Sequence, residues 1–375
     1  MEYTKTFNEL KSLFNTDKEV MLIPDSDIKI YNIDFRSDLS LNRFSNISDT
    51  LITENHSFSY PVFTPKSVES DKVILLLHGL NERSWLKYLV WAYYLAMYTD
   101  SYVILFPISF HINRSPASWK DPRAMVPFMK DRNSSLGEIT MSSFANIAIS
   151  NRLTQDPSRF FKSGYQTTLD ITQLLSTVRD GDHQIIPRSS NINIFAYSIG
   201  AFLAEIILMG NPENLFAESK LFILCGGSVF SNMRGSSKLI MDSLAFDRVY
   251  NYYLNDFEKT ITAKSPLTDF LRFNQIGMAF RSMIDLERLK TFRENTLKKL
   301  RKQIHSITLL KDTVIPSKGV VATLNSFNSS DVVEVWDFPY TYSHENPFPV
   351  FDSSLSQKVD RSFENVFSSA KSFLI

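Results

Sequence analysis

The sequence has very little cysteine, since Cys225 is the only one among 375 residues. A single thiol excludes a disulfide within the chain, and it excludes a metal site built from several cysteines. Cys225 ends an apolar run over residues 221–225. We therefore expect it to be a small buried side chain rather than a reactive thiol.

The chain also lacks a surplus of charge, because 40 Lys and Arg residues balance 40 Asp and Glu residues. Binding to nucleic acid needs a clear positive surplus, so we expect no nucleic-acid partner. Apolar runs long enough for a membrane span are missing. The first residues lack the apolar core of a signal peptide, which favours a cytoplasmic protein. The composition indicates no particular oligomeric state.

Phenylalanine, by contrast, is abundant, with 30 residues in a chain that is 43% hydrophobic. The overall composition is typical of a globular protein with a sizeable core. The aromatic side chains serve either the packing of that core or a hydrophobic substrate pocket. The composition alone leaves both interpretations open.

Apolar runs typical of buried strands alternate with helical patterns along most of the chain. This alternation predicts an α/β fold with a mostly parallel central sheet flanked by helices. The expected buried strands are residues 73–77, 102–107, 192–197, 220–225, 306–310 and 332–338. The clearest helical patterns are residues 84–98, 164–181, 199–209, 317–327 and 354–374. Antiparallel edge strands are expected at residues 19–23, 28–35 and 58–63.

Two segments interrupt this alternation and divide the chain into regions. The first is rich in proline and charge, and it leaves the carboxyl end of a strand, where open α/β sheets bind ligands. The second is predicted to be helical and is rich in Phe and Tyr. The regions are an N-terminal extension with edge strands (1–60), the core (61–110, 164–230 and 305–375), a first insertion (111–163) and a second insertion (231–304).

The first insertion carries candidate substrate-binding residues. Arg114 and Arg123 have the charge to bind a carboxylate or a phosphate. The alternative is that they are solvated or paired with Asp121 and Asp131. His111 is a candidate for the wall of a pocket.

The junction of a strand and a helix at Ser198 is the most informative stretch of the sequence. No loop separates the two elements, so the turn must be sharp, and Ala196 and Gly200 supply the small neighbours that it needs. This pattern is typical of a nucleophile elbow, which exposes a serine hydroxyl at the edge of a parallel sheet. Ser317 has similar glycine spacing but no strand before it. Tyr197 is a further candidate for contact with substrate.

Polar residues follow the expected strands in the order His78-Gly79, Ser198, Asp312 and His344. The carboxyl ends of parallel strands lie along one edge of a sheet, so these residues are expected to meet there. A serine hydroxyl needs a nearby base to act as a nucleophile, and histidine can take and return its proton. A carboxylate on the far side of the imidazole fixes its tautomer. The sequence thus predicts a catalytic triad.

This order of residues resembles that of the α/β-hydrolase-fold superfamily. The resemblance implies Ser198 as nucleophile, His344 as general base and then general acid, and Asp312 as the orienting acid. It also implies an oxyanion hole made by the backbone N–H groups of Leu80 and Ile199. Asp242 and Asp337 are rival positions for the acid, less well placed than Asp312.

The resemblance covers roughly residues 60–375 without the two insertions. It implies that His78 and Gly79 shape the loop of the oxyanion hole. Ala196 stands where glycine is usual, as in some lipases of the superfamily. A serine nucleophile does not favour the haloalkane dehalogenase and epoxide hydrolase branches, which use aspartate.

In this superfamily a lid is commonly inserted where residues 231–304 lie, so we expect a helical lid that excludes water and shapes the pocket. Core packing is an equal alternative for its aromatic residues. The candidates for its inner face are Phe246, Tyr250, Tyr253, Phe270 and Phe273.

These observations predict a serine hydrolase that cleaves an ester, thioester or amide through an acyl-enzyme. The expected substrate is a small ester-like molecule with an apolar part, and no metal or organic cofactor is implied. One alternative is a lyase or acyltransferase that uses the same triad. Another is a binding protein of the same fold without catalytic activity.

Overall fold

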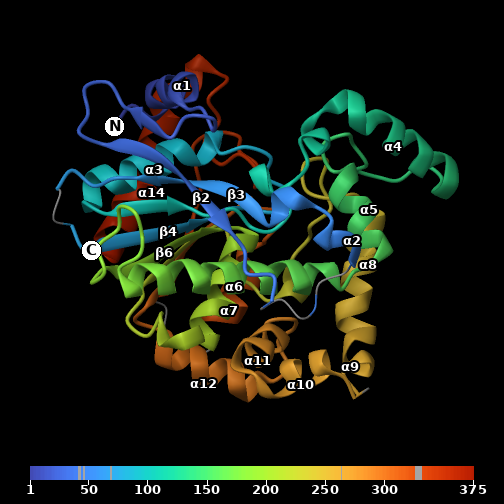
Figure 1. Cartoon of the computed structure of the whole chain (residues 1–375). Helices are drawn as coiled ribbons and strands as arrows, with labels where there is room; N and C mark the ends of the chain where they lie inside the picture. The colour runs from blue at the N-terminus through green and yellow to red at the C-terminus, as the bar shows by residue number, and fades with distance from the viewer. Residues whose placement is uncertain (41–43, 45–46, 68–69, 263, 326–331) are drawn as a thin grey trace.

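A computed structural model describes the whole chain except residues 41–43, 45–46, 68–69, 263 and 326–331. The described residues form a nine-stranded sheet in the order β1-β2-β3-β5-β4-β6-β7-β8-β9. The strands from β5 to β9 in this order pair in parallel, while β1, β2 and β3 add an antiparallel edge. Helices cover both faces of the sheet (Figure 1).

The apolar runs of the sequence form the central strands, whose side chains are almost all buried. The antiparallel edge strands are those expected near the N-terminus. The strands are β1 (Val20–Leu22), β2 (Lys29–Arg36), β3 (Ser57–Phe63), β4 (Lys72–Leu77), β5 (Tyr102–Leu105), β6 (Asn191–Tyr197), β7 (Leu221–Leu224), β8 (Ile304–Leu309) and β9 (Val333–Trp336).

Two hydrophobic clusters fill the space between the sheet and its helices. One cluster lies under α1 (Tyr3–Leu13), α3 (Leu86–Thr99) and α14 (Ser356–Leu374). The other lies under α6 (Arg159–Asp180) and α7 (Ile199–Gly210), with α13 (Ser317–Leu324) beside them. A mostly parallel sheet needs helices on both faces, and the predicted α/β-hydrolase fold is confirmed by this arrangement.

Helix α1 was not predicted, although its spacing is helical. Tyr3 and Leu10, seven residues apart, are both buried against the same cluster. The Tyr3 ring stacks on Phe363 of α14 with 4.4 Å between ring centroids. The N-terminal residues thus belong to the layer that covers one face of the sheet, and are more than an extension with edge strands.

Both insertions are helical. Helix α6 begins at Arg159, inside the segment assigned to the first insertion, because its apolar face already starts at Phe161. The first insertion contains α4 (Pro122–Leu136) and α5 (Ile147–Gln155), and a short helix α2 (Ile47–Thr50) precedes β3. The second contains α8 (Ser243–Asn251), α9 (Phe257–Thr260), α10 (Pro266–Phe273), α11 (Gln275–Ser282) and α12 (Lys290–Leu300), with a π-helical turn at Tyr252–Asp256.

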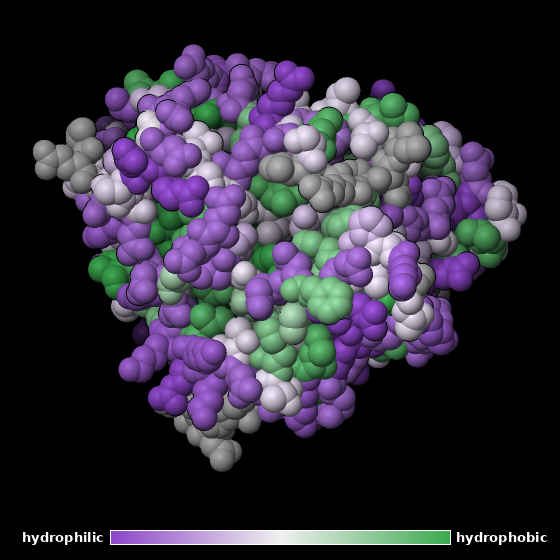
Figure 2. Space-filling model, turned by 60° about the horizontal axis from the view of Figure 1, so that its bottom comes forward, coloured by the Kyte–Doolittle hydropathy of each residue, from purple (hydrophilic) through white to green (hydrophobic). Residues whose placement is uncertain are grey.

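The second insertion divides between two places. Helix α8 packs along α5 of the first insertion, whereas α11 packs on α7 at the flank of the sheet. The α10–α12 side of the molecule mixes hydrophilic residues with small hydrophobic patches (Figure 2). Among the described residues, no helix is both long and apolar enough to cross a membrane.

Candidate active site

The turn between β6 and α7 holds Ser198 in a strained backbone conformation, with φ 58° and ψ −124°. A non-glycine residue rarely adopts positive φ, and such strain is common where a side chain must be presented. A Cβ at Gly200 would lie 2.6 Å from the carbonyl oxygens of Leu77 and His78. Only glycine therefore lets α7 start so close to the end of β4.

Ser198, His344 and Asp312 lie in a line of hydrogen bonds, and all three are buried. The distance from Ser198 Oγ to His344 Nε2 is 2.7 Å, and that from His344 Nδ1 to Asp312 Oδ2 is also 2.7 Å. A carboxylate can only accept here, so Nδ1 carries the proton and Nε2 presents its lone pair to the serine hydroxyl.

Asp312 is fixed by its own backbone. Its Oδ1 accepts hydrogen bonds from the N–H groups of Val314 and Ile315, each at 2.9 Å. These two bonds leave Oδ2 free for the imidazole. The loop after β8 thus orients the carboxylate, and the carboxylate orients His344.

The two rival acids lie in other networks. Asp242 caps α8 and forms a two-point ion pair with Arg132, at 3.1 and 3.2 Å. Asp337 accepts from the Tyr342 hydroxyl at 2.8 Å and pairs with Lys311 at 2.9 Å. Neither is a partner of His344, so Asp312 is the only one of the three candidates that contacts the imidazole.

The loop after β4 is braced by His78. The His78 Nδ1–H donates to the Gly79 carbonyl at 2.8 Å, and Nε2 accepts from the Ile108 N–H at 2.9 Å. Burial lowers the pKa of His78 well below its ordinary value, which keeps the ring neutral. The imidazole therefore joins the loops after β4 and β5 and does not reach Ser198 through a hydrogen bond.

Leu80 and Ile199, whose backbone N–H groups are predicted to form an oxyanion hole, lie beside the serine. Leu80, Ser198 and Ile199 line one small apolar pocket together. Neither N–H donates to another group of the described chain. Backbone donors without a partner in the described chain are available to a ligand, as an oxyanion hole would need.

Tyr197 packs against His344 and forms a hydrogen bond with it. Their rings stack with centroids 5.7 Å apart and 19° between planes. The Tyr197 hydroxyl donates to the His344 carbonyl, and the Lys87 ammonium lies 4.6 Å from the tyrosine ring centroid. These contacts hold the imidazole in place, and the buried Tyr197 also lines the polar space beside Ser198 and His344.

Three spaces lie at the sheet edge near Ser198, which lines two of them, while Leu80 lines all three. We call them the mouth, the side pocket and the chamber, and the latter two have volumes of about 30 and 90 Å³. The mouth is polar and is lined by residues that include Ser198, His344, Asn81, Glu82, Arg83, Lys120 and Glu345. The side pocket is lined by Ser198, Leu80, Phe160, Ile199, Phe230, Met233, Gly235, Ile240, Met241, Phe246, Val314 and Ile315.

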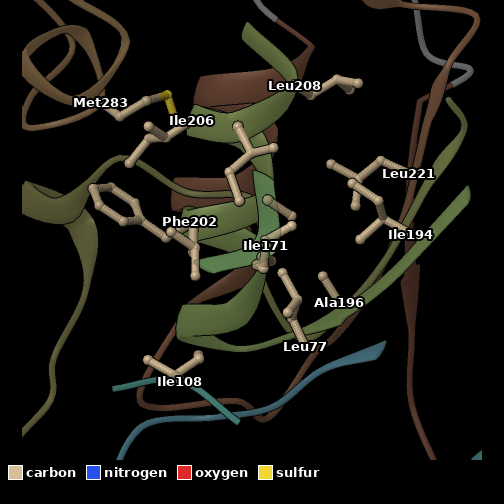
Figure 3. Close-up of a cluster of buried hydrophobic side chains, with 14 of the residues drawn as sticks. Leu77, Ile108, Ile171, Ile194, Ala196, Phe202, Ile206, Leu208, Leu221 and Met283 are labelled. Atoms are coloured by element: carbon tan, nitrogen blue, oxygen red, sulfur yellow. The ribbon is translucent and has the colours of Figure 1, made fainter. Parts of the chain in front are cut away.

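The chamber is mostly apolar, and the helix after the nucleophile forms one wall of it. Phe202, Leu203 and Ile206 of α7 line this wall. Figure 3 shows Phe202 and Ile206 on the side of α7 away from the strands, whereas Ala196 and Ile194 lie on the strand side. The other lining residues include Leu80, Ile108, Phe110, His111, Trp119, Arg152, Arg159, Phe160, Phe161, Tyr165, Ile199, Ile276 and Phe280.

Arg114 does not face any of these spaces, and the prediction that it binds substrate is wrong. It is buried in an ion pair with Asp170 of α6, with 2.6 Å between Nη2 and Oδ2. It also donates to the carbonyl oxygens of Asn55 and Pro107. The predicted alternative partners, Asp121 and Asp131, are wrong as well, because a side chain 56 residues away completes the pair.

His111 lies in the chamber wall, as expected for a pocket residue. Its Nδ1–H donates to the Ser109 carbonyl at 2.8 Å. Burial lowers its pKa to about 4, so the ring is neutral near neutral pH. Its Nε2 has no hydrogen-bond partner within the described chain.

The aromatic residues proposed for the inner face of the second insertion divide into three groups. Phe246 lines the side pocket. Tyr250, Tyr253 and Phe270 pack in aromatic clusters, and the Tyr253 hydroxyl bridges to α6 by accepting from the Phe161 N–H at 3.1 Å. Phe273 is 74% exposed, so its assignment to an inner face is wrong.

Several residues that shape the site were not predicted from the sequence. Asn81 has positive φ and donates to the carbonyl oxygens of Ala145 and Leu239, one in each insertion. Its position just after His78-Gly79 was the only feature of the sequence that could have pointed to this role. Arg152 and Phe160 line the chamber, and only the packing of distant segments reveals them. The described residues contain no group of His, Cys, Asp and Glu that could hold a metal ion.

A model described as "family of unknown function (DUF6051)" matches residues 38–375. No curated protein matches. Among solved structures, carboxyl esterase 2 from the mycorrhizal fungus Tuber melanosporum has a TM-score of 0.48 at 10% identity, with 99% of this chain and 98% of that chain covered. A bacterial heroin esterase has a TM-score of 0.47 at 10% identity, with 100% and 90% covered. Such distant similarities leave the reaction to be argued from the site.

Proposed function

Because the chain belongs to this family of unknown function, DUF6051, its activity must be argued from its own residues, and we propose that it is a serine hydrolase. The proposed reaction is cleavage of a carboxylic ester through an acyl-enzyme. The observation that carries this proposal is the unbroken hydrogen-bonded line from Ser198 Oγ through His344 to Asp312.

In the proposed mechanism, Ser198 Oγ attacks the ester carbonyl carbon while His344 Nε2 takes the hydroxyl proton. Asp312 stabilises the imidazolium that forms. The negative charge on the carbonyl oxygen is held by the N–H groups of Leu80 and Ile199. His344 then gives its proton to the departing alcohol oxygen. In the second half of the reaction, His344 takes a proton from water, which attacks the acyl carbonyl carbon, and then returns the proton to Ser198 Oγ as the acid leaves.

The orientation of the substrate follows from the position of His344. The leaving group must reach the proton on His344, and the mouth is the one of the three spaces that His344 lines. We therefore place the alcohol in the polar mouth. The acyl part then enters the apolar side pocket and chamber, which share Leu80, Phe160 and Ile199 in their walls.

We also propose that the second insertion acts as a lid. Ile240, Met241 and Phe246 of this segment line the side pocket, and Leu239 lines the mouth. A wall built from an inserted segment can exclude water from the acyl-enzyme. The thioester and amide alternatives would use the same triad, and no contact in the site favours a lyase or an acyltransferase.

Labelling with a fluorophosphonate, which traps activated serines, tests the nucleophile. Wild-type protein is expected to be labelled and to hydrolyse 4-nitrophenyl esters, and Ser198→Ala is expected to lose both, with kcat lower by about 10⁶-fold. Ser317→Ala, at the other serine with similar glycine spacing, is the matched control and should keep both. Labelling that persists in Ser198→Ala, or folded wild-type protein that neither labels nor hydrolyses, would contradict the proposal.

A further inference from the structure

Arg152 has unused hydrogen-bonding capacity at the chamber wall. Its guanidinium is largely buried and lies 4.1 Å from the ring centroid of Phe110 and 5.2 Å from that of Trp119. Within the described chain it donates one side-chain hydrogen bond, from Nη1 to Asp49 Oδ1 at 3.0 Å. A guanidinium carries five N–H donors, so most of its donor edge remains available.

Positive charges outnumber negative ones around Arg152, where Arg152, Arg159 and Lys162 share Asp49 and Asp156. Asp49 is shared with Arg159, whose Nε donates to Asp49 Oδ2 at 3.1 Å. Arg159 donates its other hydrogen bonds to the Arg152 carbonyl, Gln155 Oε1 and Ser48 Oγ. Asp49 thus serves two guanidinium groups, and Asp156, which also acts electrostatically on Arg152, is paired with Lys162 at 3.5 Å. Among the described residues, no acidic side chain lines the chamber. A desolvated positive charge without its own counter-ion is costly, and a bound anion would offset that cost.

We propose that the acyl part of the substrate is apolar and ends in a carboxylate that Arg152 binds. This inference rests on the proposed function. The planar edge of a guanidinium matches a carboxylate in geometry and charge. The apolar walls between the oxyanion donors and Arg152 suit the hydrocarbon segment. The substrate class is therefore a half-ester of a dicarboxylic acid, with its alcohol in the mouth and its free acid in the chamber.

Matched pairs of chromogenic esters test the proposal. Mono-4-nitrophenyl esters of four- to eight-carbon dicarboxylic acids are compared with 4-nitrophenyl esters of monocarboxylic acids of the same length. A charge-assisted hydrogen bond in a partly desolvated site corresponds to a preference of about 10- to 100-fold in kcat/KM. Wild-type protein is expected to show this preference at one chain length. Arg152→Met is expected to abolish the preference and Arg152→Lys to keep part of it.

The ratio of the kcat/KM values for two esters, measured in one preparation, does not depend on the fraction of the protein that is folded. Arg272→Met, which removes an exposed arginine of α10, is the control for net charge and should keep the wild-type ratio. A wild-type preference for the neutral esters at every length, or a preference for half-esters that Arg152→Met retains, would overturn the proposal.

Binding without turnover separates this proposal from the proposed function. Calorimetry measures mono-4-nitrophenyl suberate and 4-nitrophenyl octanoate with Ser198→Ala and with the double variant Ser198→Ala/Arg152→Met. Tighter binding of the suberate ester by about 10-fold or more, lost in the double variant, supports the anion site even if the enzyme proves not to be a hydrolase. Equal binding of the two esters by Ser198→Ala contradicts it, whatever the outcome of the labelling experiment.

Discussion

The sheet edge that carries the triad and the insertions that wall the chamber are held together in different ways. At the sheet edge, the loop that carries Asp312 is fixed by its own backbone, since Asp312 accepts from the N–H groups two and three residues later. The parallel strands then bring distant loops together, as with Ser198 and His344, 146 residues apart. In the insertions, partners are distant: Arg114 pairs with Asp170, 56 residues away, and Arg152 with Asp49, 103 residues away. The proposed triad thus lies on loops that the order of strands in the sheet positions, whereas the insertions depend on ion pairs between distant segments.

The largest expected effect is at the sheet edge, in the pair of Asp312 and His344. Asp312→Asn keeps the shape of the side chain but removes the charge that fixes the His344 tautomer, so kcat is expected to fall by about 10⁴-fold with little change in folding. Steady-state hydrolysis of a 4-nitrophenyl ester measures this.

Asp242→Asn is the matched control at the rival acid position. Asp242 is paired with Arg132 and not with His344, so this variant should lose stability while kcat per folded molecule stays within about threefold of wild type. If Asp242→Asn reduced kcat more than Asp312→Asn, the assignment of the acid would be wrong.

The same difference explains what the sequence could predict. Strand ends in a parallel sheet share one edge, so the order of His78, Ser198, Asp312 and His344 was enough to predict that they meet. Asp170 sits in the middle of a helical pattern, and nothing near Arg114 in the sequence points to it. The chamber was unpredictable for the same reason, since its walls come from α5, α6, α7 and α11.

The second prediction breaks a long-range pair. Asp170→Asn leaves the buried Arg114 guanidinium without a counter-charge, and the free energy of unfolding is expected to fall by about 3–5 kcal/mol. Burial raises the pKa of Asp170 even though Arg114 lies beside it, which reflects the dry surroundings of the pair. Urea unfolding followed by fluorescence measures the change.

The exposed pair of Arg179 and Glu213, with 3.0 Å between Nη2 and Oε2, gives the matched control. Glu213→Gln should reduce the free energy of unfolding by no more than about 1 kcal/mol, because water screens the two charges. An equal loss in the two variants would mean that Asp170 does not act as a buried counter-ion and that the first insertion is held by other contacts.

The smallest expected effect concerns Glu205, on the helix that connects the two regions. Like Asp312 it is a buried carboxyl, but neither of its oxygens has a hydrogen bond within the described chain. Burial raises its pKa well above the ordinary value of 4.5. Glu205→Met removes an unsatisfied polar group from α7 and is expected to raise the free energy of unfolding at pH 8 by about 1–3 kcal/mol.

The variant Glu205→Gln shows, through the pH dependence of its stability, whether the buried Glu205 carboxyl holds a proton. Below the pKa of the unfolded chain, Glu205 is protonated in both states, and its full contribution to stability is present. As the pH rises above that value, the unfolded state releases the proton and the folded state keeps it, so wild-type stability falls until the pH passes the folded pKa. Glu205→Gln cannot titrate, so its gain over wild type should be small at pH 4 and grow toward pH 8. A gain that does not change with pH would mean that the pKa of Glu205 is the same in the folded and unfolded chains, and that burial does not hold its proton.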